Sequence, residues 1–330
     1  MAPVNGKQGS SSFAVLLVDG YNVLAAKVQS VSWKKSIPLE RTDGLGDSWE
    51  EQSPTGIMIA TVTQAGAFFD TATNSIHDAF KAAALTVRLL CFAPTGNEIG
   101  GVFVGIEGSY SQTYDAAPSV GKLTKANAAY AASGQLDEGV IVQSHTSKTV
   151  DWNTKTDGTV VDYSADPTQT VIPITSATKA NPCVVTTTVA HGFSSGQKVL
   201  ISSNTLSGPA INSDLTITVL STTTFSVAVN TTGSSGAGTG GTLVRTNSLN
   251  GGVGYQSVSA LSGLTGFVGK IRDSSDDTTY ADLIDFTNVT AAPAAERKTV
   301  SGTVDRYLCF DGNVTGTGSI KPFVGFKRNA

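Results

Sequence analysis

Three observations on the sequence predict an all-β protein. Glycine, threonine and serine are abundant over the 330 residues, methionine occurs only twice, and charged residues make up 15%. Short apolar or alternating stretches recur along the chain, separated by Gly, Pro, Asn or Asp. This pattern suits short strands joined by turns better than helices. A chain of this length forms about two domains and can bury a large core.

The N-terminal region contains three strand-like stretches, at residues 13–18, 25–34 and 55–65. The interval between the second and the third is long and acidic, and Pro and Gly residues interrupt it. Loops of this length are usually either functional or disordered. Leu45 and Trp49 give this loop apolar groups to bury, which favours docking against a partner.

One helix is predicted at residues 74–85. Thr73 or Asn74 can cap its N-terminus. Apolar residues recur at helical spacing at Ile76, Ala79, Phe80 and Ala83. This stripe is expected to lie against a sheet.

Four further elements are predicted before the middle of the chain. Residues 86–92 form a buried strand that Pro94 ends. A hairpin around Glu107 and Gly108 follows. A short helix at 123–131 then precedes a strand at 134–144.

The composition changes twice along the chain. Between Thr168 and Arg245 charged residues are few, whereas Thr, Ser, Val and Gly dominate. Two such changes indicate an inserted module rather than a terminal one. We therefore divide the chain into residues 1–165 and 247–330, which form one main domain, and an inserted β-module at 166–246.

The inserted module contains short predicted strands at regular spacing, which favours a small barrel or sandwich. These strands are residues 170–174, 183–189, 197–202, 215–220, 225–229 and 241–245. A second all-β group follows the module, at residues 268–273, 279–286, 296–301, 305–310 and 321–327. Residues 276–278 form a natural hairpin turn within that group.

Charge and cysteine usage exclude several classes of protein. The net charge of -4 argues against a broad basic surface that grips DNA phosphates. Cys91, Cys183 and Cys309 lie far apart without a CxxC pair, which predicts reduced, buried thiols rather than a disulfide framework or a zinc site. No apolar run reaches the roughly 18 residues of a membrane span.

The reactive-looking motifs favour structural interpretations. Residues 192–196 fit G-x-S-x-G, but a strand follows them where a nucleophile elbow needs a helix. The histidines, His77, His145 and His191, are not at ligand spacing, and His191 is expected to support a turn.

Two further motifs also favour structural interpretations. Asp273, Asp276 and Asp277 lack the glycine and distal glutamate of a calcium loop, so a solvated turn is expected. The glycine-rich run at 233–241 precedes a strand rather than a helix, which favours a flexible loop over a dinucleotide site. No enzyme activity, metal or cofactor is expected.

Several short segments resemble a known family in their order and spacing. In the N-terminal part they are residues 19–22, 46–47, 54–56 and 66–70, and in the C-terminal part 271–276, 286–290 and 304–308. Together they resemble the major tail tube protein of long-tailed, siphovirus-type bacteriophages. The resemblance covers roughly three quarters of the chain once the inserted module is set aside.

The resemblance implies a tail-tube β-sandwich with one flanking α-helix. Six copies would close into a ring whose inner wall is a continuous β-barrel. The rings would stack into the virion's tail tube, through which DNA passes without specific binding. It further implies contact with the tape-measure protein and with tail terminator and distal tail proteins, assembly in the host cytoplasm, and no membrane association.

The acidic loop at residues 38–54 resembles the arm by which rings of this family contact one another. Its candidate interaction residues are Glu40, Arg41, Asp43, Asp47, Trp49, Glu50 and Glu51. A solvated acidic face is the alternative reading of this loop.

The inserted module carries a second resemblance, to small β-modules of phage structural proteins that are similar to a β-domain of ubiquitin-activating enzymes. It rests on residues 181–186, 190–193, 196–199 and 224–225. The resemblance implies no ubiquitin chemistry, and a module on the tube exterior is expected because an insert in the lumen would block it.

Two other functions remain open from the sequence. A virion decoration or receptor-binding protein would use its β-modules to contact carbohydrate. It would require an exposed aromatic platform, and Phe193 and Phe225 lie at core-like positions of the module. A hydrolase would depend on Ser194.

Overall fold

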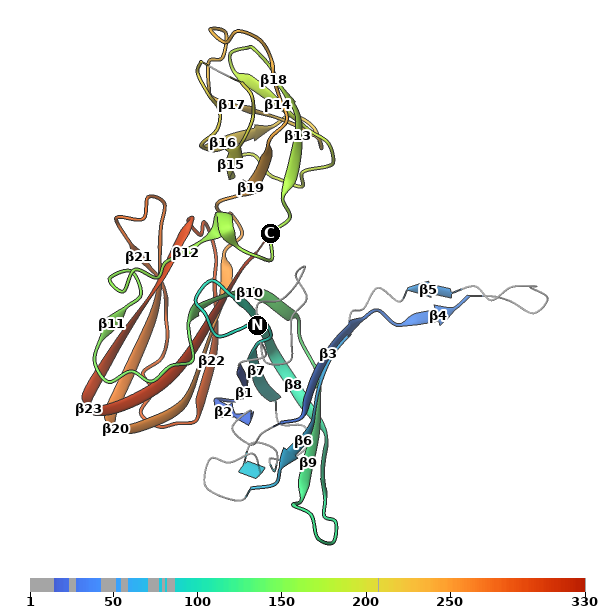
Figure 1. Cartoon of the computed structure of the whole chain (residues 1–330), viewed down its shortest axis with the longest axis vertical. Helices are drawn as coiled ribbons and strands as arrows, with labels where there is room; N and C mark the ends of the chain where they lie inside the picture. The colour runs from blue at the N-terminus through green and yellow to red at the C-terminus, as the bar shows by residue number, and fades with distance from the viewer. Residues whose placement is uncertain are drawn as a thin grey trace, which may run out of the picture.

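The computed structural model describes residues 15–23, 28–42, 52–54, 59–70, 77–78, 81, 87–206 and 208–329. Within these ranges the protein consists mainly of β-strands, with a 3-10 turn η3 (Tyr163–Ala165), a 3-10 residue at Val23 and helical residues at His77 and Asp78. Figure 1 shows a body of long strands, a small barrel at one end, and an arm that projects to the side. The all-β class predicted from composition is therefore confirmed.

The body is one large sheet with several branches. Its main path runs through β2 (Tyr21–Asn22), β1 (Val15–Val18), β7 (Val87–Ala93), β8 (Val102–Ala117), β10 (Leu136–Gln143), β23 (Tyr307–Arg328), β20 (Gly252–Ser274) and β21 (Ala281–Asp285). Off this path, β11 (Trp152–Asn153) and β12 (Val161–Asp162) pair with β23, and β22 (Ala294–Val300) pairs with β20. A second branch carries β3 (Ser30–Ser36), β6 (Ile59–Phe68) and β9 (Lys125–Ala132), which connect to the body through β8.

The longest ladder joins β20 to β23, from the pair Gly252 and Arg328 to the pair Ser274 and Tyr307. The predicted strands at 305–310 and 321–327 are thus parts of one 22-residue strand. The sequence pattern breaks between them because residues 311–319 are polar and rich in glycine. Gly312 is required there: a Cβ at this position would lie 2.4 Å from the Trp152 ring.

A buried polar network connects the body strands. The Asp137 carboxylate is 1% exposed and accepts a hydrogen bond from the Tyr255 hydroxyl at 2.6 Å. Lys327 Nζ lies 2.6 Å from one Asp137 oxygen, and Arg297 Nη2 lies 3.6 Å from the other. Two cations and a hydroxyl thus compensate the cost of burying this charge.

Residues 19–22, singled out in the sequence, form the tight turn after β1, at Asp19 and Gly20, and the strand β2. Asp19 and Gly20 both have positive φ, at 48° and 86°. A Cβ on Gly20 would lie 2.6 Å from backbone atoms of Ala294, so only glycine fits. The Asp19 carboxylate accepts hydrogen bonds from the Leu89 N–H at 2.7 Å and from Arg88 Nη1 at 2.8 Å. The motif therefore stabilises the junction of β1 with β7.

The inserted segment folds as a closed six-stranded barrel. Its strands follow the order β14 (Cys183–Thr187), β17 (Thr224–Val227), β16 (Asp214–Val219), β15 (Lys198–Ser202), β19 (Thr242–Arg245) and β13 (Ile172–Ala177). β13 also pairs with β14, so the ring closes, and β18 (Gly238–Thr239) pairs with β13. Phe225, Ile217 and Val199 lie fully buried in its centre. Of the two predicted forms, the barrel is the one found.

Two predicted elements are wrong. Residues 123–131, predicted as a short helix, lie largely in β9, where alternate alanines are buried between β6 and β8. Tertiary pairing here overrides the helix propensity of alanine. The predicted hairpin around Glu107 and Gly108 is one continuous strand, β8, with a bulge between Ser111 and Thr113.

The flanking helix predicted at residues 74–85 falls largely outside the described residues. Of that segment the structure describes His77, Asp78 and Lys81, and the Lys81 N–H donates to the His77 carbonyl at 2.8 Å. His77 and Asp78 are helical, and the length of the predicted helix is not tested because its other residues, apart from Lys81, lie outside the described ones.

The remaining predictions concern the cysteines, the turn at Asp276 and membrane-spanning segments. Cys91, Cys183 and Cys309 are buried free thiols, as predicted. The Asp276 carboxylate accepts the Thr278 N–H at 2.9 Å in the predicted turn. Among the helical residues that the structure describes, none belongs to a helix with the length and hydropathy of a membrane span.

Candidate assembly surfaces

The arm consists of β4 (Leu39–Arg41) and β5 (Gln52–Pro54), which extend from the ends of β3 and β6 (Figure 1). Every residue of these two short strands is exposed. An isolated two-stranded ladder is marginal in water. We therefore expect the arm to gain stability when it contacts another surface.

The predicted interaction residues fall in this arm. Glu40 and Arg41 are exposed on β4. Asp43, Asp47, Trp49, Glu50 and Glu51 lie outside the described residues.

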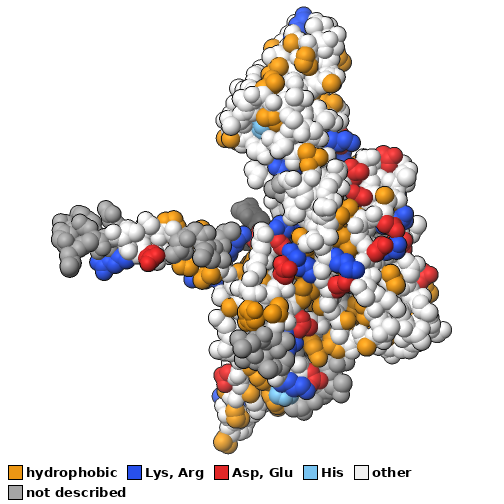
Figure 2. All heavy atoms as spheres, turned by 180° about the vertical axis from the view of Figure 1, so that it is seen from behind, with side chains coloured by type: hydrophobic (Ala, Val, Ile, Leu, Met, Phe, Trp, Pro, Cys, Tyr) orange, Lys and Arg blue, Asp and Glu red, His pale blue; other side chains and the backbone are white. Residues whose placement is uncertain are grey.

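The sequence prediction missed the apolar residues at the root of the arm. Ile37, Leu39 and Ile59 are 45%, 59% and 45% exposed. Figure 2 shows apolar side chains along the arm and where it meets the body. The sequence pattern does not distinguish these three residues, because single apolar residues alternate with polar ones in this stretch.

Strands β3, β6, β9 and β8 form a four-stranded sheet with two different faces. One face packs on a core that contains Val62, Tyr130 and Phe92. The other, which we call the outer face, carries small side chains in most positions: Ser32, Thr61, Thr63, Thr113, Ala129 and Ala131. Its larger side chains are Tyr110 and Ile59, which are 37% and 45% exposed, and its charged ones are Lys34, Asp115 and Lys125. The outer face is thus hydroxyl-rich and of mixed sparse charge.

This sheet has two open edges among the described strands. β3 pairs with β6 alone. The last part of β8, from Ser111 to Ala117, pairs with β9 alone, because the β7 ladder on its other side ends at Tyr110. Open edges present backbone N–H and C=O groups that can pair with another strand.

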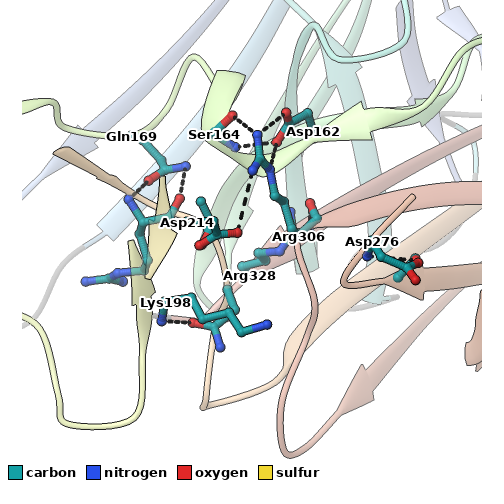
Figure 3. A network of polar contacts seen from close by, with 12 residues as sticks. Asp162, Ser164, Gln169, Lys198, Asp214, Asp276, Arg306 and Arg328 are labelled. Atoms are coloured by element: carbon teal, nitrogen blue, oxygen red, sulfur yellow. Dashed lines mark hydrogen bonds and ion pairs between the residues drawn. The ribbon is translucent and has the colours of Figure 1, made fainter. Parts of the chain in front are cut away.

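The barrel is attached to the body through Arg306 (Figure 3). Its Nε and Nη2 donate to the two carboxylate oxygens of Asp162 at 2.9 and 2.8 Å, and Nη1 lies 3.5 Å from Asp214 of β16. Burial opposes ionisation of Asp162, but hydrogen bonds from Arg306 and Ser164 outweigh it and hold its pKa below the ordinary value. One guanidinium therefore links carboxylates of the body and of the barrel.

Gln169 fixes the connection on the other side. Its amide nitrogen donates to the Arg245 carbonyl and its oxygen accepts the Arg245 N–H, both at 3.1 Å. The entry and exit of the inserted module thus lie side by side.

The reactive-looking motifs have structural roles. His191 Nδ1 accepts the Phe193 N–H at 3.0 Å, and Nε2 lies 3.0 Å from the Ser221 carbonyl, so it supports a turn as expected. The Ser194 N–H donates to Gln197 in the turn before β15. In the described ranges, no three His, Cys, Asp or Glu side chains are grouped closely enough to hold a metal ion.

Comparisons with known proteins give distant structural similarities. No protein-family model and no curated protein sequence matches the chain. Solved structures that align with it include a chain of the virion of a native gene transfer agent particle, at 17% identity and a TM-score of 0.29, over 40% of this chain and 98% of that one. A chain from the tail of an empty gene transfer agent particle, refined with C6 symmetry, aligns at 16% identity and 0.29, over 39% and 97%. The SPP1 Dit protein, described as a hub of the adsorption apparatus of phages that infect Gram-positive hosts, aligns at 9% identity and 0.27, over 94% and 98%. At these TM-scores the alignments do not establish a common fold.

Proposed function

We propose that this protein is a structural subunit of a bacteriophage tail. Copies of the chain join edge to edge into a ring, and rings stack into a tube that conducts the genome. The observation that carries the proposal is the four-stranded sheet with two open edges and a sparsely charged outer face. The ring has six members, the number that the family resemblance implies.

Ring closure follows from the two edges. β3 of one copy pairs with the last part of β8 of the next, so each contact uses two different surfaces. A heterologous contact of this kind closes into a ring when its rotation permits. The four strands of each copy then form one segment of a continuous barrel.

The outer face suits the wall of a conduit. Each lysine or arginine that contacts a DNA phosphate adds affinity, which would oppose sliding. Serine, threonine and alanine occupy most positions of this face beside Tyr110, and the cations Lys34 and Lys125 are accompanied by Asp115. DNA and the tape-measure protein therefore pass without specific binding.

The arm serves as the contact between rings. Its exposed apolar root and the residues Glu40 and Arg41 dock on the neighbouring ring, together with the acidic residues up to Glu51. Obligate contacts of this type bury about 2,000 Å² or more. The tail terminator and distal tail proteins would meet the two ends of the stack.

The inserted module, residues 166–246, lies on the exterior of the tube. It divides a tube domain made of residues 1–165 and 247–330. The barrel projects from one end of the body, away from the four-stranded sheet (Figure 1). A module in this place decorates the tube without entering the bore.

Cross-linking between the two edges tests the ring. Ser32→Cys on β3 and Thr113→Cys on β8 place two thiols three strands apart within one chain, about 14 Å at the usual strand spacing. A disulfide needs Cα atoms within about 7 Å, so it can form only between copies. Oxidation of the double variant should give a ladder on a denaturing gel that ends at six chains.

Each single-cysteine variant provides the matched control and should remain monomeric on the same gel. A double variant that stays monomeric after oxidation, although particles of ring size are present by sedimentation, would refute edge pairing. A strictly monomeric wild-type protein would refute the proposed function.

A further inference from the structure

The junction between body and barrel contains a pocket of about 450 Å³. Ligand pockets typically range from about 300 to 1,000 Å³. Its walls come from both units: Tyr163 and Arg328 belong to the body, and His191, Phe193 and Arg245 to the barrel. The remaining lining residues are Thr168, Gln169, Thr170, Ile172, Val189 and Ala190.

The pocket is cationic in a protein of net charge -4. Two arginines line it, and none of its lining residues is acidic. Asp166, which lies near the rim in sequence, has its Oδ1 occupied by the N–H and hydroxyl of Thr168.

Arg328 is buried, and no described carboxylate forms an ion pair with it. Its side chain is 8% exposed and stacks on the Tyr163 ring, with Cζ 4.1 Å from the ring centre. Nη2 donates to the carbonyls of Asp305 and Arg306, whereas Nε and Nη1 have no partner among the described residues. Burial lowers the pKa of Arg328 to about 10. The carboxylates of Asp166, Asp273 and Asp162 offset this burial only in part, since the pKa remains lowered. A buried guanidinium with unpaired nitrogens is costly, and a further anion nearby would reduce that cost.

Arg245 supplies the second cation at the pocket. Its guanidinium lies over the Phe193 ring at 5.3 Å, and Nη2 lies 3.5 Å from the Gly192 carbonyl, the limit of a hydrogen bond. The side chain also acts as a hydrogen-bond partner of the Tyr163 hydroxyl across the pocket. A guanidinium has five N–H donors, so donors remain for a ligand.

The other walls fit a compact hydroxylated molecule. The rings of Tyr163, Phe193 and His191 give flat apolar surfaces. The Thr170 hydroxyl adds a donor and an acceptor, and the Thr168 hydroxyl, whose proton is donated to Asp166, adds an acceptor. From this combination we propose that the junction pocket binds a small polyhydroxylated acid, a sugar that carries a carboxylate or a phosphate, with the oxyanion held by Arg245 beside Arg328. The site is independent of ring formation, since it lies at the barrel junction and not at the open edges.

Isothermal titration calorimetry of the full chain tests this inference. D-glucuronate and D-glucose 6-phosphate should each bind, whereas D-glucose at the same concentration should give no heat of binding. Binding of only one acid would identify the oxyanion that the site accepts. Equal binding of glucose, or no binding of either acid at millimolar concentration, would overturn the proposal.

Arg245→Gln removes one cation from the pocket without disturbing the barrel core. Loss of a charge-assisted hydrogen bond should weaken binding of the acid about tenfold or more. Lys179→Gln is the matched control, because it makes the same charge change at an exposed position of the module away from the pocket, and it should bind as the wild type does. Unchanged affinity in Arg245→Gln would refute the site, whatever the outcome of the cross-linking experiment.

Discussion

The barrel and the four-stranded sheet use the same kind of strand in opposite ways. Every strand of the barrel has a neighbour on each side, because β13 pairs with both β14 and β19. In the sheet, β3 and the last part of β8 each have one described neighbour. A closed ring satisfies its backbone within one molecule, whereas an open sheet leaves pairing groups for another copy.

Stability of the single chain and association between chains depend on different parts of the molecule. The barrel and the buried body strands determine whether one chain is stable. In the proposed function, the open edges and the arm determine whether chains associate. Variants in the first group should therefore change unfolding and leave assembly intact, and variants in the second group should do the reverse.

The largest effect on assembly is expected from the arm. Replacing residues 40–51 by a short Gly-Ser linker should allow rings but prevent stacking, because the contact between rings is removed. Electron microscopy and sedimentation velocity would show isolated rings in place of tubes. Tubes of normal length in this variant would remove the role assigned to the arm.

The next largest effect is a loss of stability of the body, and the barrel should unfold as in the wild type. Asp137→Ala leaves Lys327 and Arg297 without their buried partner, which typically costs about 3–5 kcal/mol. Trp33, Trp49 and Trp152 all lie outside the barrel, so tryptophan fluorescence during urea denaturation reports on the body.

Asp157→Ala is the matched control for that measurement. This carboxylate is 49% exposed and lies 3.7 Å from Lys148 Nζ, so its loss should cost less than about 1 kcal/mol. Equal effects of the two substitutions would show that the buried network does not stabilise the body.

A smaller, pH-dependent effect is expected from His145. Its Nε2 lies 2.7 Å from Ser259 Oγ, and burial, with a contribution from Lys321, lowers its pKa to about 4. The unfolded chain binds the proton first, near pH 6.5, so stability is complete above that pH and falls as the pH decreases toward 4. Between pH 7 and pH 5 the loss from this group is about 2 kcal/mol.

His145→Gln should remove that part of the pH dependence. Gln keeps a hydrogen-bonding group near Ser259 but does not titrate. The free energy of unfolding, measured at both pH values, should then decrease less in the variant than in the wild type. An identical decrease in both proteins would contradict the assigned pKa.

The smallest effect on assembly is expected from removing the barrel. The module's entry and exit lie side by side at Gln169 and Arg245, so a short linker can replace residues 166–246. Tubes should form with an unchanged bore and without external knobs in electron micrographs. A folded variant that fails to form tubes would show that the module bridges subunits.

Local patterns predicted much of this architecture. Short β-branched runs between turns identified the barrel strands, and the spacing around His191 and Asp276 predicted their turns correctly. These features depend on residues close in sequence.

Features that depend on distant residues were missed. The alanine-rich β9 is a strand because β6 and β8 flank it, and the glycine-rich centre of β23 continues as a strand because Trp152 packs over Gly312. The apolar root of the arm was overlooked for a similar reason, since burial and exposure of single apolar residues are set by the fold. No local pattern could indicate which strand edges remain open.

A cryo-electron microscopy reconstruction of the assembled protein tests the central claim most directly. The expected map has β3 of one copy hydrogen-bonded to the final residues of β8 of the next, with Thr63 facing a central bore. A map in which each copy's sheet ends without a neighbouring strand, and in which no bore is present, would contradict it.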